Sequence, residues 1–244
     1  MMDAQENLMD SAEGALRRLS GGRVLDVATG SGGFLGLLTE NFMDYIEIIG
    51  IDSNERPLET ARQAYPLENI RFLQMDAARM DFNDGYFDTV CISNSLHHMA
   101  NLPGVLAEML RVCKPGGHIL VSEMFRDAQS ATQLTHVYLH HWWAAVDTIQ
   151  GISHFETYTR GQIVDIWDSL SLHNTEQYEQ KDLDANPKDP ELIRELESII
   201  DRYIQRLQDL EAGSKLRQRG EQLRRRVHEV GFHGATTLFL IGQK

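Results

Sequence analysis

The chain has 244 residues and 42% hydrophobic side chains, a size and composition that suit one α/β domain with additions and a large core. The formal net charge of -13 argues against nonspecific binding to nucleic acid or to anionic membranes. Because no apolar run approaches membrane-spanning length and residues 1–15 carry no cationic or apolar signal segment, we expect a cytoplasmic protein.

The first elements that the sequence predicts are a helix at residues 4–19 and a buried strand. Gly21 and Gly22 end the helix. The strand covers Arg23–Val27, where branched apolar side chains suit a strand buried on both faces. The helix has its apolar residues near helical spacing, at Leu8, Ala12, Ala15, Leu16 and Leu19.

A turn of small residues at 28–33 follows this strand and leads into a helix that starts near Phe34. Strand, glycine turn and helix N-terminus together form a nucleotide-binding corner. Ala28, Gly30 and Gly33 also fit a loose dinucleotide fingerprint. Asp26 argues against a dinucleotide as the ligand, because its carboxylate would repel the pyrophosphate. The same carboxylate can hold a water or an ammonium group. A tight turn without any ligand is the remaining alternative.

Two further strands end in carboxylates. Asp52, at the tip of Glu47–Asp52, can accept hydrogen bonds from both hydroxyls of a ribose. It could instead cap the helix that opens at residues 53–57. Asp76 ends the strand at 70–76 and could accept the exocyclic amine of an adenine, although a turn residue is the alternative.

The next strands, at 87–94 and 118–123, flank a helix that follows Pro103 and stops at residues 114–117. Strands that alternate with helices imply a parallel sheet with right-handed crossovers and a ligand at the carboxyl ends of its strands. Cys91 falls in a core strand and Cys113 at a helix end, so both are interpreted as buried thiols.

This series of motifs, over residues 23–125, resembles the class I S-adenosylmethionine-dependent methyltransferases. The turn from Asp26 to Gly32 is most similar to the variant in the quinone-biosynthesis methyltransferases. The resemblance implies an α/β fold with a Rossmann-like, seven-stranded, mostly parallel sheet, helices on both faces and a helical cap. It also implies S-adenosylmethionine as cofactor.

The resemblance assigns the cofactor-binding residues to the strand ends. Asp26 would help to hold the ammonium group, Asp52 would bind the ribose, and Ala28 replaces the more usual first glycine without abolishing binding. The adenine would meet Asp76 and the backbone of Ala77. The full set expected to bind the cofactor is Asp26, Ala28, Gly30, Gly32, Asp52, Ser53, Asp76, Ala77 and Asn94.

The fold that the resemblance implies normally closes with an antiparallel hairpin. Its last strand fits residues 236–244, and the best choice for the partner strand is His173–Gln180. The chain between the fifth strand and the end is longer than a bare sheet needs. We therefore expect a single domain, 1–244, with helical cap insertions at about 126–170 and 181–213.

The second insertion has clear helix signals. Asp189 can cap the helix, Pro190 fits its first position, and Gly213 can end it. Its apolar stripe is expected to pack against the main domain, with a homodimer contact as the alternative. The stripe consists of Leu192, Ile193, Leu196, Ile199, Ile200, Tyr203, Ile204, Leu207 and Leu210.

The first insertion contains a helical stripe of His136, His140, Trp143 and Asp147. Three interpretations stay open: a solvated polar face, a face that contacts the substrate, and a metal site. We assign no metal here. His136, Trp143 and Asp147 are predicted to bind the substrate, together with His98.

The function predicted from these features is methyl transfer to a small-molecule acceptor. The sulfonium already carries an activated methyl group, so a base is needed only where the acceptor must lose a proton. His97 and His140 are the candidate bases. The alternatives are an NAD-dependent oxidoreductase, a non-methylating enzyme that uses the same cofactor, and a noncatalytic cofactor-binding module.

Overall fold

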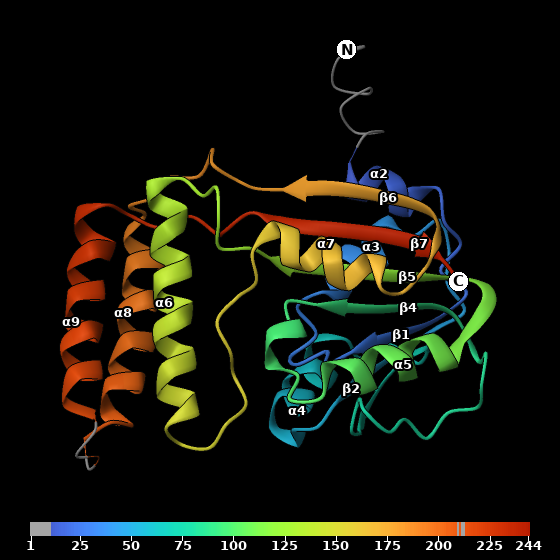
Figure 1. Cartoon of the computed structure of the whole chain (residues 1–244), viewed down its shortest axis with the longest axis horizontal. Coiled ribbons are helices and arrows are strands. Elements are labelled where there is room, and N and C mark those ends of the chain that lie inside the picture. Colours follow the sequence, from blue (N-terminus) through green and yellow to red (C-terminus); the bar gives the residue numbers. More distant parts are fainter. Residues whose placement is uncertain (1–10, 209, 211–212) are drawn as a thin grey trace. The chain divides into compact units, whose positions relative to one another are not determined.

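The computed structural model describes residues 11–208, 210 and 213–244, which form two compact units. The sheet unit consists of the described chain up to Glu123 together with Val164–Gln180 and Leu238–Lys244. The helical unit consists of Met124–Ile163 and the described part of Lys181–Thr237. The chain thus passes from one unit to the other after residues 123, 163, 180 and 237 (Figure 1).

The sheet unit is built on seven strands in the order β3-β2-β1-β4-β5-β7-β6. The pairs β1/β2, β2/β3, β1/β4 and β4/β5 are parallel. At the other edge the Lys244 N–H donates to Gly117 O (2.9 Å), so the end of β7 lies beside the early part of β5 and β7 runs antiparallel. The strands are β1 (Arg23–Val27), β2 (Glu47–Asp52), β3 (Ile70–Gln74), β4 (Phe87–Ser93), β5 (Cys113–Met124), β6 (His173–Gln180) and β7 (Thr237–Gln243).

This topology confirms the predicted seven-stranded, mostly parallel α/β fold. The central strands form because their side chains are apolar on both faces: four of the five residues of β1 are buried, and so are Ile48, Ile49 and Ile51 of β2. The partner of the last strand is β6, at the bounds that the sequence indicated.

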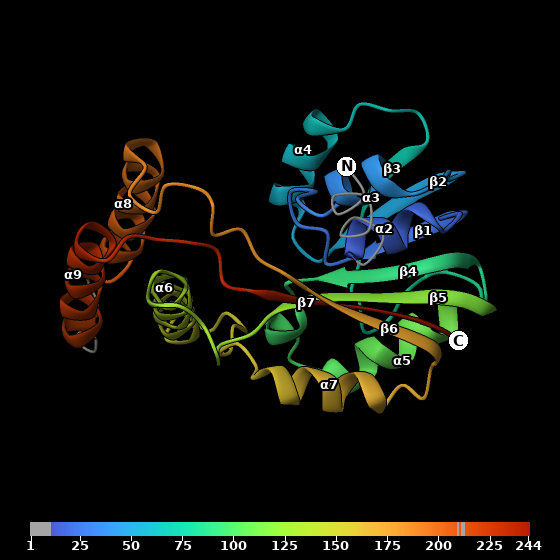
Figure 2. The same ribbon diagram turned by 90° about the horizontal axis from the view of Figure 1, so that it is seen from above.

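Helices cover both faces of the sheet (Figure 2). One face carries α2 (Ala12–Arg17), α3 (Leu35–Asn41) and α4 (Glu55–Ala64), and the other carries α5 (Leu102–Val112) and α7 (Arg160–Asp168). Of the predicted N-terminal helix at 4–19, residues 4–10 lie outside the described residues, and within the remainder α2 ends at Arg17, two residues before the predicted end. The core below α2, α3 and α4 contains Ala12, Leu16, Val24, Leu35, Leu38, Ile48, Leu58, Ala61, Phe72, Cys91, Leu120 and Phe239.

The helical unit consists mainly of α6 (Ala131–Thr148), α8 (Pro190–Gln205) and α9 (Gly213–Glu229). Its core contains Leu139, Trp142, Val146, Leu196, Ile200, Leu207, Leu223 and Val227. The apolar stripe of α8 therefore packs inside the helical unit, on α6 and α9, whereas the sequence predicted packing against the main domain. The difference arises because α9 lies beside α8, where Arg224 pairs with Asp201.

The predicted start of α8 is confirmed, since the Asp189 side chain accepts from the Glu191 and Leu192 N–H groups and Pro190 opens the helix. The predicted end at Gly213 is wrong: α8 ends at Gln205, and Gly213 begins α9. A Cβ at Gly213 would lie 2.7 Å from Leu207 O, so a glycine is needed where the start of α9 approaches the backbone of Leu207. Among the described residues, no helix has both the length and the apolar character needed to cross a membrane.

Candidate functional site

The turn after β1 has a backbone shaped for close approach of a ligand. Ala28, Gly30 and Gly32 have φ of 55°, 54° and 83°. A left-handed conformation costs a residue with a Cβ roughly 1–2 kcal/mol, so Ala28 is held in place by its surroundings. A Cβ placed on Gly30 or Gly33 would meet no atom within 4 Å, so open space adjoins the turn there.

Asp52 connects the end of β2 with this turn. Its Oδ2 accepts from Gly30 N–H (3.0 Å) and its Oδ1 from Asn54 N–H (2.9 Å). The cap of α4 is Asn54, whose side chain accepts from Arg56 N–H, so Asp52 is not the helix cap. Each oxygen of Asp52 retains a lone pair for a further donor.

Asp26 is buried beneath the turn, with 1% of its surface exposed. Thr29 Oγ1 donates to its Oδ2 (2.6 Å), and Cys91 Sγ lies 3.6 Å from its Oδ1. Burial raises the pKa of Asp26 to about 7, against the opposing effect of the Thr29 hydrogen bond. The contacts in the structure therefore give Asp26 a role in fixing the turn, while the expected ammonium contact stays a prediction.

The other residues predicted to bind the cofactor lie at the carboxyl ends of the neighbouring strands. Asp76 is exposed after β3, where its Oδ1 accepts from Ala78 N–H (2.8 Å). Asn94 follows β4 with a φ of 44°, and its N–H donates to Ser122 O (2.7 Å). Because β1, β2, β3 and β4 are adjacent and parallel, all of these strand ends share one edge of the sheet.

His97 forms a buried pair with Glu123, a residue that the sequence analysis missed as functional. It lies in a short 3-10 helix, Leu96–His98, after β4, and Glu123 lies near the end of β5. His97 Nδ1 is 2.7 Å from Glu123 Oε1, and Glu123 Oε2 accepts from Leu96 N–H (2.9 Å). Both side chains have no exposed surface. A carboxylate at the end of an apolar core strand is the signal that could have identified Glu123.

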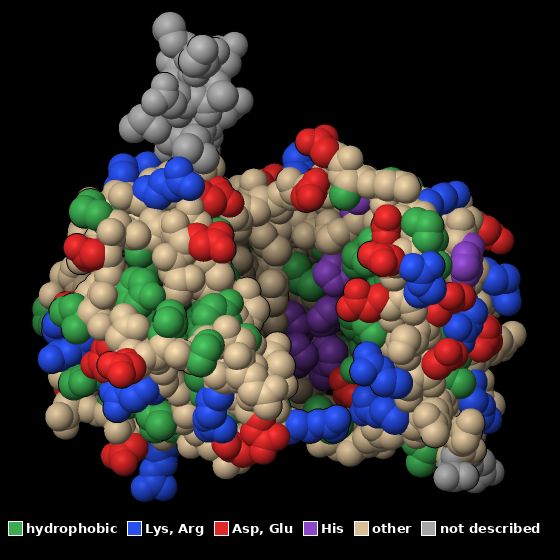
Figure 3. All heavy atoms as spheres, turned by 180° about the vertical axis from the view of Figure 1, so that it is seen from behind, with side chains coloured by type: hydrophobic (Ala, Val, Ile, Leu, Met, Phe, Trp, Pro, Cys, Tyr) green, Lys and Arg blue, Asp and Glu red, His purple; other side chains and the backbone are tan. Residues whose placement is uncertain are grey.

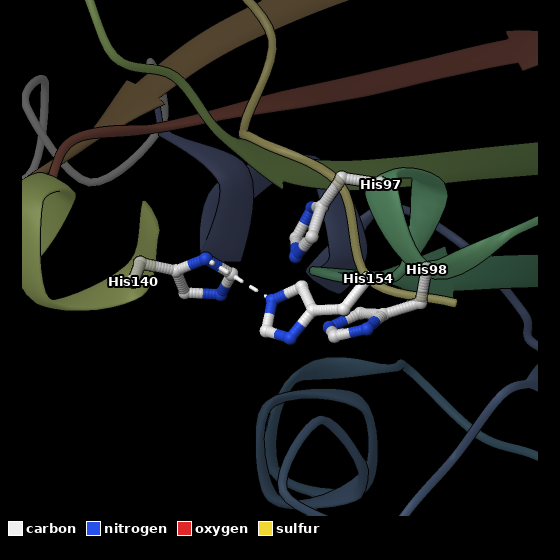
Figure 4. A group of neighbouring side chains, drawn as sticks. All are labelled: His97, His98, His140 and His154. Atoms are coloured by element: carbon white, nitrogen blue, oxygen red, sulfur yellow. Dashed lines mark hydrogen bonds between the residues drawn. The ribbon is translucent and has the colours of Figure 1, made fainter. Parts of the chain in front are cut away.

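His98 lies next to His97, with the two ring centroids 4.4 Å apart. Its side chain is half-buried. The two residues are drawn in Figure 4 and come from the same turn of the sheet unit. The dipeptide therefore combines one fixed imidazole, held by Glu123, with a neighbouring imidazole of greater exposure.

In the helical unit, Asp147 of α6 is buried, with 7% of its surface exposed. Its Oδ2 lies 2.7 Å from His154 Nδ1, and its Oδ1 accepts from Arg206 Nη2 (2.5 Å). Burial acts to raise the pKa of Asp147, but the hydrogen bonds from His154 and Arg206 prevail and lower it. Arg206 is a partner that the sequence pattern did not indicate.

The structure connects two residues of the predicted histidine stripe and gives a third a different partner. His140 Nδ1 lies 3.4 Å from His154 Nε2, so His140 and Asp147 are linked through His154. His136 Nδ1 accepts from Ala235 N–H (2.9 Å). The Trp143 ring lies 5.9 Å from that of His140. Trp143 Nε1 is buried and has no hydrogen-bond partner among the described residues.

On the face of the helical unit seen in Figure 3, Lys and Arg side chains are mixed with Asp and Glu side chains. A cluster of arginines on an acidic chain, such as the one on α9, is typical of a solvated helix face. Arg226 departs from this, because its Nε donates to Thr135 Oγ1 (3.1 Å) and its guanidinium lies over the Tyr138 ring. At least this arginine holds α9 against α6.

The strand order, the glycine turn after β1 and the carboxylates that end β2 and follow β3 define a class I S-adenosylmethionine-dependent methyltransferase domain. Residues 25–121 match the family model described as "Methyltransferase domain". The match covers less than half of the chain and shows what this part of it is similar to. The match ends within β5, so α6, α7, α8 and α9 lie outside it.

Curated relatives match the same part of the chain. The ubiquinone/menaquinone biosynthesis C-methyltransferase UbiE of Stutzerimonas stutzeri is 37% identical over 111 residues, which cover 42% of each protein. The UbiE protein of Idiomarina loihiensis is 34% identical over 122 residues, 48% of each. The chain thus matches less than half the length of these relatives.

Solved structures share the fold over most of the chain. The YcgJ protein of Bacillus subtilis is 18% identical with a TM-score of 0.59, covering 95% of this chain and 97% of that one. Phosphoethanolamine N-methyltransferase 2 of Haemonchus contortus, solved with S-adenosyl-L-methionine, is 17% identical with a TM-score of 0.55, covering 95% and 52%. At these identities the likeness shows the fold alone.

Proposed function

We propose that the protein transfers the methyl group of S-adenosylmethionine to a small-molecule acceptor. The observation that carries this proposal is the contact of Asp52 with the Gly30 N–H, which places a carboxylate with spare lone pairs beside a glycine turn. The family of residues 25–121 and the C-methyltransferase relatives support the proposal.

The residues at the strand ends fit the cofactor. The open space beside Gly30 and Gly33 can receive the methionine portion, which Asn94 would also adjoin. Asp52 would accept from the ribose hydroxyls, and Asp76 from the adenine amine. When bound, the cofactor supplies a methyl group already activated by its sulfonium, so the chain's own task is alignment of the acceptor. We keep Asp26, Ala28, Gly32, Ser53 and Ala77 in the proposed cofactor site as the remaining residues of the same strand ends.

His97 is the proposed base for an acceptor that must lose a proton. An ionised Glu123 beside Nδ1 requires that this nitrogen carries the proton, which leaves the lone pair on Nε2. The acceptor proton would pass to Nε2, and the acceptor would take the methyl group. Glu123 acts as a positioning residue, because it fixes the ring and compensates the imidazolium that forms.

The helical unit is the proposed source of substrate contacts. Trp143 Nε1 is a buried donor without a partner among the described residues, and a bound acceptor could satisfy it. His136 and Asp147 complete the contacts proposed for the helical unit, and each also makes a hydrogen bond within that unit. His98 is kept as a proposed substrate contact of the sheet unit. His140 is considered separately below.

The test is binding of S-adenosylhomocysteine by calorimetry to the full chain and to Asp52→Ala. Loss of this partner should weaken binding by about 1–3 kcal/mol, which is roughly 5- to 150-fold. Glu68→Ala is the matched control, because Glu68 is an exposed acid in the turn before β3 and should leave the affinity unchanged. Equal affinity of the folded Asp52→Ala variant and the wild type would refute the site.

Activity is tested by incubating the protein with methyl-labelled cofactor and a panel of small-molecule metabolites. Label in a product supports methyl transfer, whereas cofactor binding without any labelled product favours a non-methylating enzyme or a binding module. We further propose a cytoplasmic location, which the two buried free thiols, Cys91 and Cys113, favour. A homodimer stays a prediction that sedimentation can test.

A further inference from the structure

Two histidines of the helical unit have the spacing of ligands to one metal ion. His140 lies on α6 and His154 in the segment that follows it. His140 Nδ1 and His154 Nε2 are 3.4 Å apart, and the planes of the two rings meet at 82° (Figure 4). Two nitrogens bound at about 2.0–2.1 Å to a tetrahedral ion lie about 3.4 Å from each other. Hydrogen bonds from N–H donors are normally shorter, at about 2.7–3.2 Å.

Asp147 sets the orientation of one of the two rings. Because His154 Nδ1 donates to the carboxylate at 2.7 Å, the lone pair of His154 lies on Nε2, on the side of His140. Arg206 Nη2 donates to the other carboxylate oxygen at 2.5 Å, which compensates the buried charge. A histidine that donates to a carboxylate through one nitrogen and binds metal through the other is the usual arrangement at metal sites.

The surrounding hydrogen bonds fix this arrangement before any ion binds. Thr148 Oγ1 donates to His154 O (3.1 Å) and anchors the segment that carries the second imidazole. Arg206, the C-terminal cap of α8, also donates through Nε to Gln150 Oε1 (2.8 Å). The ligand pair therefore rests on α6 and on the end of α8, within a single unit.

We propose that His140 Nδ1 and His154 Nε2 are two ligands of a divalent transition-metal site in the helical unit, with Asp147 as the residue that positions His154. Imidazole nitrogens favour Zn²⁺, Co²⁺, Ni²⁺ or Cu²⁺ over Mg²⁺ and Ca²⁺. Water or an oxygen or nitrogen atom of a small molecule would occupy the other positions. An oxygen ligand would bind more readily as its anion, with its proton released to water. The site goes beyond the proposed methyl transfer and needs no cofactor to be tested.

The experiment is a titration of the metal-stripped full chain with Co²⁺, followed by its visible absorption bands, and then with Zn²⁺. The wild type is expected to bind one Co²⁺ per chain and to release it to Zn²⁺. His140→Ala and His154→Ala should each lose this binding. Asp147→Asn should weaken it about 10- to 100-fold. Circular dichroism on each variant checks that it is folded, and His140→Gln and His154→Gln replace any alanine variant that is not.

His228→Ala is the matched control. His228 lies on α9, half-exposed, with its Nε2 2.9 Å from Glu197 Oε1, and its removal should leave Co²⁺ binding unchanged. A wild-type chain that binds no Co²⁺ at one equivalent would overturn the proposal. Unchanged binding in folded variants of both His140 and His154 would overturn it as well, and the 3.4 Å contact would then be a hydrogen bond between imidazoles.

Discussion

At the scale of single residues, Asp26 shows how a buried carboxyl group holds the turn after β1. Its carboxyl group is buried and depends on Thr29 and Cys91 for its contacts. Burial raises its pKa to about 7 in the folded chain, whereas a carboxyl in an unfolded chain titrates near its ordinary value of 3.8. The folded state therefore binds this proton more tightly than the unfolded state.

We predict that the stability contributed by Asp26 is present below pH 4 and is lost as the pH rises through about 7. In that interval the unfolded chain has released the proton that the folded chain retains, so the free energy of unfolding falls. Asp26→Asn should remove this part of the pH dependence, by at most about 4 kcal/mol. Urea unfolding of both proteins between pH 4.5 and 8 measures it, and parallel curves would contradict the prediction.

A second prediction at this scale concerns Glu123. Replacement by Ala would leave His97 Nδ1 and the Leu96 N–H buried without the carboxylate that now accepts from both. We expect the free energy of unfolding to fall by about 2–4 kcal/mol, and by less in Glu123→Gln, which can still accept one hydrogen bond. Denaturant unfolding checks both values. Equal stability of Glu123→Ala and the wild type would show that water or a shifted ring replaces the carboxylate.

At the scale of elements, the contact between α6 and α9 depends on one glycine. A Cβ at Gly220 would lie 2.5 Å from Trp142 Cζ2, so no side chain fits there without movement of the indole. Trp142 is in turn held by the hydrogen bond from its Nε1 to Leu216 O (2.8 Å). The glycine is required for close packing of the two helices, although it weakens α9 as an isolated helix.

We therefore predict that Gly220→Ala lowers the free energy of unfolding by about 1–3 kcal/mol, because overpacking outweighs the gain in helix propensity. Gly161→Ala in α7 is the control: its Cβ meets no atom within 4 Å, and the substitution should stabilise by up to about 1 kcal/mol. Thermal unfolding of the two variants shows whether each substitution raises or lowers the stability of the chain. Stabilisation by both would show that Trp142 moves aside without cost.

At the scale of the whole molecule, the chain crosses between its two units four times, so neither unit is a continuous segment. The helical unit is formed by two stretches of chain, Met124–Ile163 and the described part of Lys181–Thr237. Val164–Gln180, which lies between them in the sequence, belongs to the sheet unit, and the second stretch leads into β7. The proposed cofactor site lies wholly in the sheet unit, whereas the proposed metal site lies wholly in the helical unit.

We predict that S-adenosylhomocysteine at 100 times its dissociation constant stabilises the chain by about 2.7 kcal/mol, because it binds the folded state alone. The unfolding temperature should rise in the wild type, and much less in Asp52→Ala at the same ligand concentration. His140→Ala should retain the full rise, since all of the proposed cofactor-binding residues belong to the sheet unit and His140 is not one of them. A rise of the same size in Asp52→Ala would contradict the assignment of the cofactor site.

The sequence by itself determined the parts of this protein that depend on neighbours along the chain. Apolar strands, the turn at 28–33 and the cap formed by Asp189 are each set by a few consecutive residues, and they lie where the patterns predicted them. Parallel strands bring their ends to one edge, so the shared location of Asp52 and Asp76 also followed from the sequence. The topology of the sheet could be predicted from the sequence because the order of strands and helices permits few alternatives.

Only the tertiary structure decided which distant residues meet. Helical periodicity placed His136, His140 and Asp147 on one stripe, but it could not supply Arg206, 59 residues beyond Asp147, or direct His136 to the backbone of Ala235. The pairing of Glu123 with His97 and the packing of α8 on α9 were missed for the same reason. Such contacts depend on how buried polar groups and apolar faces are satisfied across the chain, and a local pattern carries no information about the partner.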